Sequence, residues 1–593
     1  MSVNMVAPSI ETLGPSAGPL DVRSFAAKPP TEQPRLDALL SRLGESATPF
    51  ARLAIGQKVA LLREVQSRMH AVSEEWVAAA CRAKGISVEE PLSGEEWIAG
   101  PAVTLRNIRF LLRSLGEIEQ QGVPSIEPKR TRDLPHGAVG IRVTPFDAYD
   151  AALYGGLSAE TWLLPGIRRG DVAGHQASFY KQKAPEGCVS LVLGAGNVAS
   201  IPPMDVVYKM FVDGHVCILK MNPVNEYLGA LFERVFEPLI AKGYLAIVYG
   251  GADVGAYLCE HPAVGDVHIT GSDKTHDLIV WGPPGPERDD RKRRNDPLLK
   301  KPITSELGNV SPVIVVPGPY TDAELASMAA NVAGMICNNA SFNCNAAKML
   351  VVPKGWAKRE LFVRMLSSVL AGVPPRKAYY PGARQRYDAL TGGHADVRKI
   401  GAGSEHVLPW TLVLGLDPES QTETNFTTEP FCAILSEVAI GSTDPVGFLG
   451  EAVSFANDHL WGTLNATLFV HPAFEADAAG KRALDTALAG LKYGTVGINV
   501  WPALGYALCT TPWGGHPSAT LTDIQSGLGW VHDTLMLEDI EKCVVRGPLR
   551  PVPKHVYFPG HRSLHRLGRR LVDFEAAPSW LKVPGLAAAA LRG

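Results

Sequence analysis

Cysteines are the first residues of this chain whose type and spacing suggest chemistry. The chain has nine of them and no CxxC pair, and the closest two, Cys337 and Cys344, are seven positions apart. Cysteine metal sites use tighter pairs, so we expect no metal centre. An odd, unpatterned set of thiols in a long chain is typical of a cytoplasmic protein. We interpret eight as small core residues and one as a reactive nucleophile.

A glycine-rich segment, GAGNVA (194–199), directly follows the apolar run CVSLVLG (188–194). It fits the GxGxxG/A fingerprint of dinucleotide-binding folds. That fingerprint also requires an acidic residue about 20 positions later, at the end of the next strand. Here that strand ends in LKMNP (219–223), so the acidic residue is missing. The segment therefore needs another explanation.

Four patterns in chain order together resemble the aldehyde dehydrogenase superfamily between residues 184 and 515. They are GAGNVASIPP with ILKMNP, HITGS, ITSELGNVSP and SFNCNAAKMLVV. The last resembles the family pattern GQxCxAxxR, which implies that Cys344 is the nucleophile. Ser341 and Phe342 replace Gly-Gln, and Met349 replaces the arginine. Cys337, the competing thiol, lacks the small residues that should follow.

The resemblance also implies two partners for Cys344. Asn197 would donate its side-chain amide to the oxyanion, beside the backbone N–H of the nucleophile. Glu306, in a segment similar to LELGGKSP, would be the general base that activates water. Asn309 stands where the family has its second glycine. Taken alone, Asn197 fits a turn and Glu306 a surface position; the surrounding matches favour the catalytic interpretation.

Five further residues are implied to bind a nicotinamide cofactor. Lys220 would bind a ribose, and Gly271 and Ser272 would open a helix whose free N–H groups approach the pyrophosphate. TTEPFCAILSEV (427–438) resembles EEIFGPVL, which places Glu429 and Phe431 at the nicotinamide ribose and ring. The family position that often carries an acidic residue against NADP is Pro223 here, so the resemblance allows NAD or NADP.

The implied reaction oxidises an aldehyde to a carboxylic acid through a thiohemiacetal and a thioester on Cys344. One alternative is the CoA-dependent branch, acylating aldehyde dehydrogenases and acyl-CoA reductases, which resolve the thioester with CoA. A third hypothesis, from a different functional class, is that the protein is a non-catalytic oligomeric scaffold of the same fold. Glu306 favours water over CoA, and the joint presence of Asn197, Glu306 and Cys344 disfavours the scaffold.

Hydrophobic periodicity predicts the elements that position these residues. Apolar runs alternate with helical stretches from residue 188 onward, with strands expected at 188–194, 215–222, 244–251, 264–272, 312–318 and 348–355. This alternation indicates parallel, doubly wound sheets. The fold class is therefore α/β, and the resemblance implies two doubly wound α/β domains plus a β-hairpin oligomerisation arm.

The expected domain limits follow from these elements. They are a loose leader (1–34), an NAD(P)-binding domain (35–301) that includes part of the arm near 133–183, a catalytic domain (302–505), the return to the arm (506–550) and a C-terminal extension (551–593). We expect the charged stretch 282–301 to be a solvated surface loop. HRSLHRLGRRLVDF, in the extension, predicts an amphipathic helix that packs or is solvated, with an acidic surface or lipid as its less favoured contact.

Composition narrows the range of partners. The 593 residues are 46% hydrophobic and 20% charged, with a net charge of −3, so nothing indicates nucleic acid as a partner. The N-terminus has no basic start before an apolar stretch, and no apolar run has the length of a transmembrane helix. We expect a cytoplasmic protein that binds a small aldehyde, and CoA in the alternative. The resemblance implies a homodimer or homotetramer.

Overall fold

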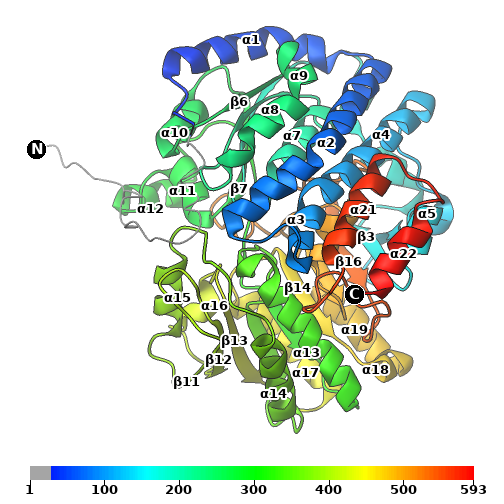
Figure 1. Cartoon of the computed structure of the whole chain (residues 1–593), viewed down its shortest axis with the longest axis vertical. Helices are drawn as coiled ribbons and strands as arrows, with labels where there is room; N and C mark the ends of the chain where they lie inside the picture. The colour runs from blue at the N-terminus through cyan, green and yellow to red at the C-terminus, as the bar shows by residue number, and fades with distance from the viewer. Residues whose placement is uncertain (1–27) are drawn as a thin grey trace, which may run out of the picture.

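Two β-sheets organise the chain, and the computed structural model describes residues 28–593. Most of the expected leader, 1–34, lies outside the described residues. Helix α1 (Gln33–Ala51) begins near the expected end of that leader. Figure 1 shows the smaller sheet in the upper half of the molecule and most of the larger one in the lower half. Each sheet has its own cluster of buried hydrophobic side chains.

The smaller sheet has five parallel strands in the order β6-β5-β4-β7-β8. This confirms the parallel arrangement predicted from the alternating pattern. The strands are β4 (Val189–Leu193), β5 (Val216–Lys220), β6 (Leu245–Val248), β7 (Asp266–Gly271) and β8 (Ile303–Leu307). The helices that connect the strands are α7 (Ile201–Phe211), α8 (Gly229–Val235), α9 (Glu237–Ala241), α10 (Ala252–Glu260) and α11 (Asp273–Trp281). Because β8 pairs with β7, the chain leaves this sheet after residue 307 rather than at 301.

Long N-terminal helices cover this sheet. Helix α1 packs on β4, β5 and β6, and α2 packs on α4 and α8. Their apolar positions recur every three or four residues, which buries one face of each helix. The helices are α2 (Ile55–Lys84), α3 (Gly94–Trp97) and α4 (Val103–Gln121), with one π-helical turn, η3 (Ile98–Ala102), between the last two.

The larger sheet has eleven strands in the order β1-β2-β3-β16-β15-β14-β9-β10-β13-β12-β11. Its six central strands, from β15 to β12, are parallel, as the pattern predicted. These are β9 (Pro312–Val315), β10 (Met349–Pro353), β12 (Trp410–Leu416), β13 (Ile434–Ile440), β14 (Asn465–Phe469) and β15 (Thr495–Ile498); β11 (Asp396–Ile400) is antiparallel at one edge. The helices of this half are α13 (Asp322–Cys337), α14 (Arg359–Ala371), α15 (Ala383–Thr391), α16 (Thr424–Thr427), α17 (Pro445–His459), α18 (Pro472–Ala476), α19 (Ala478–Gly490) and α20 (Ala503–Leu508).

The strands expected to form an arm lie at the other edge of this sheet. They are β1 (Thr131–Asp133), β2 (Val139–Thr144), β3 (Ser158–Leu163) and β16 (Ile540–Arg546). Helix α5 (Ala148–Leu153) joins β2 to β3, and α6 (Ser178–Lys181) follows β3 on the way to β4. Strand β16 pairs parallel with β15 and antiparallel with β3. These strands thus extend the chain's own sheet, and assembly into dimers or tetramers stays a prediction.

The charged stretch 282–301 corrects one expectation, because it contains a helix rather than only a loop. Helix α12 (Pro286–Arg294) starts with proline, has acidic residues in its first turn and has basic residues in its last turn. That order complements the helix dipole and stabilises the helix ends. An ion pair of 2.6 Å between Lys292 and Asp277 ties it to α11. The order of the charges therefore stabilises a helix in a segment whose high polarity had suggested a loop.

The C-terminal extension is folded against the rest of the chain. The predicted amphipathic helix is confirmed as α21 (Leu564–Ala576), and α22 (Val583–Leu591) follows it. Helix α21 packs on α2, α3 and α4; Figure 1 shows it in red, close to α3. None of the helices within residues 28–593 combines the length and hydrophobicity needed to cross a bilayer.

Candidate functional site

A cavity of about 1260 Å³ lies between the two sheets, at the carboxyl end of the smaller one. In parallel α/β sheets this edge is where ligands bind. All eight residues singled out from the sequence line this cavity: Asn197, Lys220, Gly271, Ser272, Glu306, Cys344, Glu429 and Phe431. The structure therefore brings together residues that are separated by more than 200 positions in the chain.

Cys344 stands where the large cavity meets a second cavity of about 110 Å³, since it lines both. Three successive residues before it, Asn339, Ala340 and Ser341, have left-handed backbone angles, with φ of 51°, 54° and 70°. Such angles are unfavourable for residues other than glycine, and they cluster at functional sites. The rival thiol, Cys337, is the last residue of α13 and lines neither cavity. The geometry thus favours Cys344.

The Cys344 thiol and the Glu306 carboxyl share a buried space. Glu306 lies in β8 and is 2% exposed, and neither of its carboxylate oxygens has a well-formed hydrogen bond. Burial raises the pKa of Glu306 to about 7, although the neighbouring Cys344 thiol and Trp513 indole lower it in part. Burial, together with the Glu306 charge, holds the pKa of the Cys344 thiol well above its usual range. The resting thiol is therefore protonated, with a base beside it that ionises near neutral pH.

Asn197 connects the glycine-rich loop to the loop that carries Cys344. Its side-chain amide donates a hydrogen bond of 2.9 Å to the Phe342 carbonyl oxygen. A primary amide has two N–H groups, so a second donor remains available beside Cys344. The surrounding glycines are explained by packing, because a Cβ on Gly196 would lie 2.7 Å from the Asn222 amide oxygen. Close approach of two loops therefore accounts for the glycine-rich segment that lacked its acidic partner.

Asn339 is a central residue that sequence reasoning missed. Its amide nitrogen donates to the Asn197 carbonyl (3.1 Å), the Phe342 carbonyl (3.1 Å) and the Asn343 side chain (3.0 Å). Its amide oxygen accepts from Lys84 and from the Tyr379 hydroxyl, both at 2.9 Å. Asparagine tolerates left-handed backbone better than most residues, so the pair Asn338-Asn339 before the cysteine was the available signal.

The part of the cavity next to the smaller sheet contains a buried cation and a helix N-terminus. Lys220 ends β5 and is 8% exposed, and burial lowers the pKa of its ammonium group. Ser272 is the N-cap of α11, where its hydroxyl accepts a hydrogen bond from the Thr275 backbone N–H. Gly271 directly precedes this cap. A helix N-terminus beside a buried lysine suits an anionic ligand.

Glu429 has a partner that the sequence did not reveal. The Lys348 ammonium group forms an ion pair with the Glu429 carboxylate and donates to the backbone carbonyls of Cys344 (2.7 Å) and Asn309 (3.0 Å). A Cβ on Gly308 would lie 2.0 Å from the Glu429 carboxylate. The glycine that follows Leu307 is therefore required for this carboxylate to reach the cavity.

Phe431 belongs to an aromatic group on the wall of the cavity. Its ring centroid lies 4.9 Å from that of Tyr380 and 5.8 Å from that of Phe342. Its backbone is left-handed, with φ of 42°. The Arg386 guanidinium donates to the Pro430 and Phe431 carbonyl oxygens at 3.0 and 3.2 Å and so stabilises that turn.

One group of potential metal ligands occurs among residues 28–593, although the sequence predicted none. Ligand atoms of Cys188, His215 and Asp266 lie within 4.8 Å of one another. The Lys209 ammonium group donates to Asp266 at 2.8 Å. The Lys209 ammonium group therefore already supplies a positive charge beside these three residues. None of the three lines the large cavity.

Comparisons with known proteins agree with this geometry. A sequence model described as the aldehyde dehydrogenase family matches residues 167–382. Betaine aldehyde dehydrogenase from Agrobacterium fabrum (strain C58) is 25% identical over 513 residues, which cover 83% of this chain and 91% of that protein. Hydroxyisobutyraldehyde dehydrogenase from Mycolicibacterium austroafricanum is 28% identical over 55% of this chain, and the chain spans 61% of that protein's length. Other aldehyde dehydrogenases match over 27% to 36% of their own lengths.

Solved structures resemble the fold over most of its length. An NADP-dependent glyceraldehyde-3-phosphate dehydrogenase from Bacillus halodurans, complexed with NADP, has a TM-score of 0.58 at 16% identity and covers 88% of this chain and 92% of its own. A γ-glutamyl-γ-aminobutyraldehyde dehydrogenase from Burkholderia cenocepacia also has a TM-score of 0.58, at 18% identity, over 87% and 89%. These matches confirm the two-domain α/β fold expected from the sequence.

Proposed function

The chain belongs to the aldehyde dehydrogenase superfamily, and on that premise we propose that it oxidises an aldehyde to a carboxylic acid with NAD or NADP. One observation carries the proposal. Cys344 and Glu306 both line the large cavity and the small one, so a nucleophile and a base meet where two binding spaces join. A dinucleotide suits the large cavity and an aldehyde the small one.

The large cavity fits a nicotinamide dinucleotide in size and donor set. Its volume of about 1260 Å³ exceeds the roughly 300–1,000 Å³ typical of drug-sized ligands. Lys220 would bind a ribose, Gly271 and Ser272 the pyrophosphate, and Glu429 and Phe431 the nicotinamide end. Two solved structures of similar fold are complexed with NADP, which supports NADP beside NAD.

The first half of the reaction forms a bond from Cys344 sulfur to the aldehyde carbon. Glu306 accepts the thiol proton, and the carbonyl oxygen takes the negative charge. The Asn197 amide and the Cys344 backbone N–H donate to that oxygen; removing one such donor typically costs about 3–4 kcal/mol. NAD or NADP, when bound, supplies a ring that accepts the hydride from the same carbon, which becomes a thioester.

Water completes the reaction. Glu306 first releases the thiol proton to solvent. Ionised again, it takes a proton from a water molecule whose oxygen attacks the thioester carbon. The carbon–sulfur bond breaks, a carboxylic acid leaves, and the thiol is regenerated. The burial and the pKa of about 7 of Glu306 support this role, since the group can gain and lose a proton near neutral pH.

The test follows NAD(P)H formation by purified protein with a panel of aldehydes, with and without CoA. We expect turnover without CoA, an acid as the product, and no turnover in Cys344→Ala. Glu306→Gln should lose most of the steady-state turnover, because the activation of the thiol and the attack of water both need this carboxylate. A strict requirement for CoA would instead support the acylating branch, and no turnover with either cofactor across a broad panel would support the non-catalytic relative.

A further inference from the structure

Three segments that are far apart in the chain form the walls of the small cavity beside Cys344. It shares Ile201, Glu306 and Cys344 with the large cavity. Aromatic side chains from the region after β15 make one side: Trp501, Tyr506 and Trp513. Side chains from the helices before β1 make another: Ile98, Ala99 and Val103. The C-terminal extension makes a third, through Val556, Tyr557 and Leu564.

The charge of this cavity excludes anionic ligands. Among the described residues that line it there is no lysine, arginine or histidine. Its two charged residues are the carboxylates Glu95 and Glu306, and Glu95 is neutralised by Arg376 at 2.6 Å. A carboxylate or phosphate on the substrate would therefore have no cation to replace its lost hydration, and burying such a charge unpaired is costly. The lining suits an uncharged, apolar chain.

The extension is held firmly at the cavity. The Tyr557 hydroxyl donates to the Asn331 amide oxygen and accepts from the Trp501 backbone N–H, both at 3.0 Å. A Cβ on Gly334 would lie 2.5 Å from the Tyr557 carbonyl, and a Cβ on Gly94 would lie 2.4 Å from Leu564. Such close contacts leave little room for Tyr557 or Leu564 to move away from the site.

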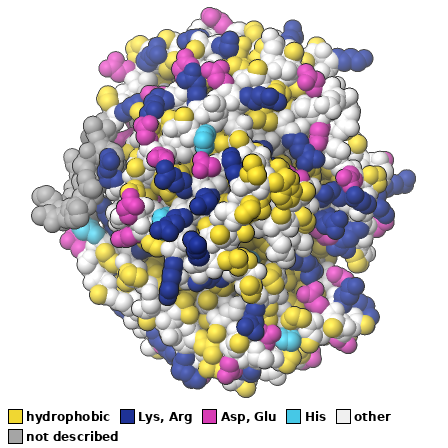
Figure 2. Space-filling view, turned by 45° about the vertical axis from the view of Figure 1, so that its right-hand side comes forward, with side chains coloured by type: hydrophobic (Ala, Val, Ile, Leu, Met, Phe, Trp, Pro, Cys, Tyr) yellow, Lys and Arg dark blue, Asp and Glu magenta, His cyan; other side chains and the backbone are white. Residues whose placement is uncertain are grey.

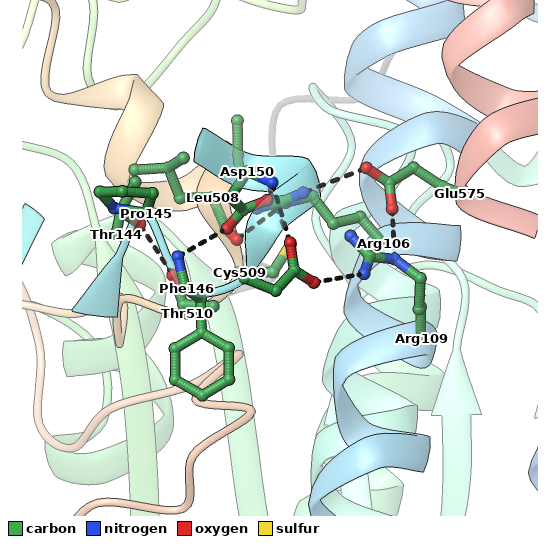
Figure 3. A network of polar contacts seen from close by, with 12 residues as sticks. Arg106, Arg109, Thr144, Pro145, Phe146, Asp150, Leu508, Cys509, Thr510 and Glu575 are labelled. Atoms are coloured by element: carbon green, nitrogen blue, oxygen red, sulfur yellow. Dashed lines mark hydrogen bonds and ion pairs between the residues drawn. The ribbon is translucent and has the colours of Figure 1, made fainter. Parts of the chain in front are cut away.

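A buried ion network fixes the helix that follows Leu564. Glu575, near the end of α21, is 1% exposed and pairs with Arg106 at 3.1 Å and with Arg109 at 2.6 Å. Arg106 also pairs with Asp150 at 2.8 Å and donates to the Leu508 carbonyl. Figure 3 shows this network between α4, α5 and the C-terminal helix. The extension is therefore part of the folded core rather than a mobile tail.

The outer side of the extension differs from the side that lines the cavity. Figure 2 brings the side with α21 and α22 forward and shows hydrophobic side chains gathered near the middle of this face. The four most exposed large hydrophobic residues in the described chain all belong to the extension: Val552, Trp580, Leu581 and Leu591. Leu581, which is 92% exposed, lines neither cavity and offers a control for Leu564, which is 6% exposed.

We propose that residues 551–593 form a fixed wall of the aldehyde pocket, and that this wall selects short, uncharged, apolar aldehydes. The inference rests on the proposed aldehyde oxidation and adds its substrate class. Size supports it, because an engineered apolar cavity of roughly 150 Å³ holds benzene, and this one measures about 110 Å³. Long chains are excluded by Val556, Tyr557 and Leu564, and anionic chains by the missing cation.

The first experiment measures kcat/KM for straight-chain aldehydes of increasing length and for one short aldehyde that ends in a carboxylate. We expect the wild type to prefer short neutral chains over the carboxylate by at least about tenfold. Leu564→Ala should move the preference toward longer chains by about tenfold or more, since one methylene in an apolar pocket changes rates by roughly 10–200-fold. Leu581→Ala should keep the wild-type preference. Val556→Ala is the second pocket variant if Leu564→Ala lowers the melting temperature.

Equal rates on long and short chains, or a preference for the carboxylate, would overturn the wall proposal while leaving aldehyde oxidation intact. A second measurement does not depend on turnover. A short and a long N-alkyl maleimide compete for Cys344, and the labelled peptide is quantified by mass spectrometry. We expect discrimination against the long reagent in the wild type and in Leu581→Ala, and its loss in Leu564→Ala. Unchanged labelling in Leu564→Ala and Val556→Ala would refute the wall even if no aldehyde were oxidised.

Discussion

At the scale of single residues, the Glu306 carboxyl and the Cys344 thiol are two acidic groups that lie side by side. Burial raises both pKa values, and each group modifies the other. A nucleophile of this kind gains its activity from an adjacent base rather than from a thiolate that exists at rest. The pH behaviour of the protein should therefore report the ionisation of Glu306.

The pH dependence of activity provides the first prediction. Glu306 can accept a proton only when ionised, and its pKa is about 7. We expect kcat/KM to rise with pH through about 7 and to reach a plateau above it. The measurement is a pH–rate profile with a short neutral aldehyde. In Glu306→Gln the residual rate should not show this step; a step that persists in the variant would assign it to another group.

The same residue predicts a pH-dependent change in stability. Folding raises the pKa of Glu306 from 4.5 to about 7. Its contribution to stability is therefore fully present below pH 4.5 and is lost as pH rises through 7. At about 1.36 kcal/mol per pKa unit, the loss is on the order of 3 kcal/mol. Glu306→Gln should unfold at nearly the same denaturant concentration as wild type at pH 5 and at a higher one at pH 8; an equal gain at both values would contradict the burial argument.

At the scale of elements, the loop that carries Cys344 depends on hydrogen bonds from distant segments. Residues with strained backbone angles cost about 1–3 kcal/mol each and persist only when surrounding contacts stabilise them. Asn339 supplies contacts to Lys84, Asn197 and Tyr379, which come from three different parts of the chain. Through this loop, Lys84 at the end of helix α2 is connected to the segment that carries Cys344.

Removing the Asn339 side chain should lower activity through positioning. We expect Asn339→Ala to reduce kcat by about tenfold or more, because about 1.4 kcal/mol of transition-state stabilisation equals a factor of ten. KM should change less, since neither cavity is lined by Asn339. Asn457→Ala is a matched control, because Asn457 also lines neither cavity and donates to the Gly490 carbonyl. A higher KM with an unchanged kcat would argue against a positioning role.

The C-terminal helix should depend strongly on Glu575. Replacing one partner of a buried ion pair typically costs about 3–5 kcal/mol, because the remaining charge is left unpaired. We expect Glu575→Ala to lower the free energy of unfolding by that amount and to expose α21 to limited proteolysis. Asp573→Asn is the matched control on the same helix. Its pair with His70 is half exposed, and such pairs contribute roughly 0–1 kcal/mol. Similar losses in both variants would show that the network does not anchor the helix.

At the scale of the whole molecule, the large cavity joins the two halves of the protein. Lys220 and Ser272 come from the smaller sheet, whereas Glu429 and Phe431 come from the region beside the larger one. A ligand that contacts both halves stabilises the folded chain as one unit. The same interface places Cys344 of one half against Glu306, at the end of β8, in the other.

Cofactor binding should therefore raise the melting temperature. A ligand at one hundred times its Kd adds about 2.7 kcal/mol to folded-state stability. We expect a shift with NAD, NADP or both, and a smaller shift in Lys220→Ala at the same concentration. Lys301→Ala is the matched control, because Lys301 lines the same cavity but donates to the Cys259 and His261 carbonyls. An unchanged shift in Lys220→Ala would remove this lysine from the cofactor site.

Sequence alone determined the features that depend on short-range patterns. The parallel strands β4, β5, β7 and β10 follow from apolar runs bounded by turn residues. Six of the eight candidate residues that line the large cavity follow from four short motifs in order, and Glu429 and Phe431 follow from a fifth pattern. The sequence also predicted helix α21, because its amphipathic spacing lies within one continuous segment. The helix α12 was missed because polarity was weighed above the order of its charges.

Only the tertiary structure decided which distant segments meet. Asn339 holds Asn197 beside Cys344, Lys348 pairs with Glu429 across 81 positions, and Tyr557 and Leu564 close the small cavity from the far end of the chain. No local pattern encodes these contacts, because each depends on how two sheets and the C-terminal helices pack together. The motifs therefore predict a nucleophile, a base and a cofactor site, while packing between remote segments sets the strain behind the nucleophile and the shape of the pocket in front of it.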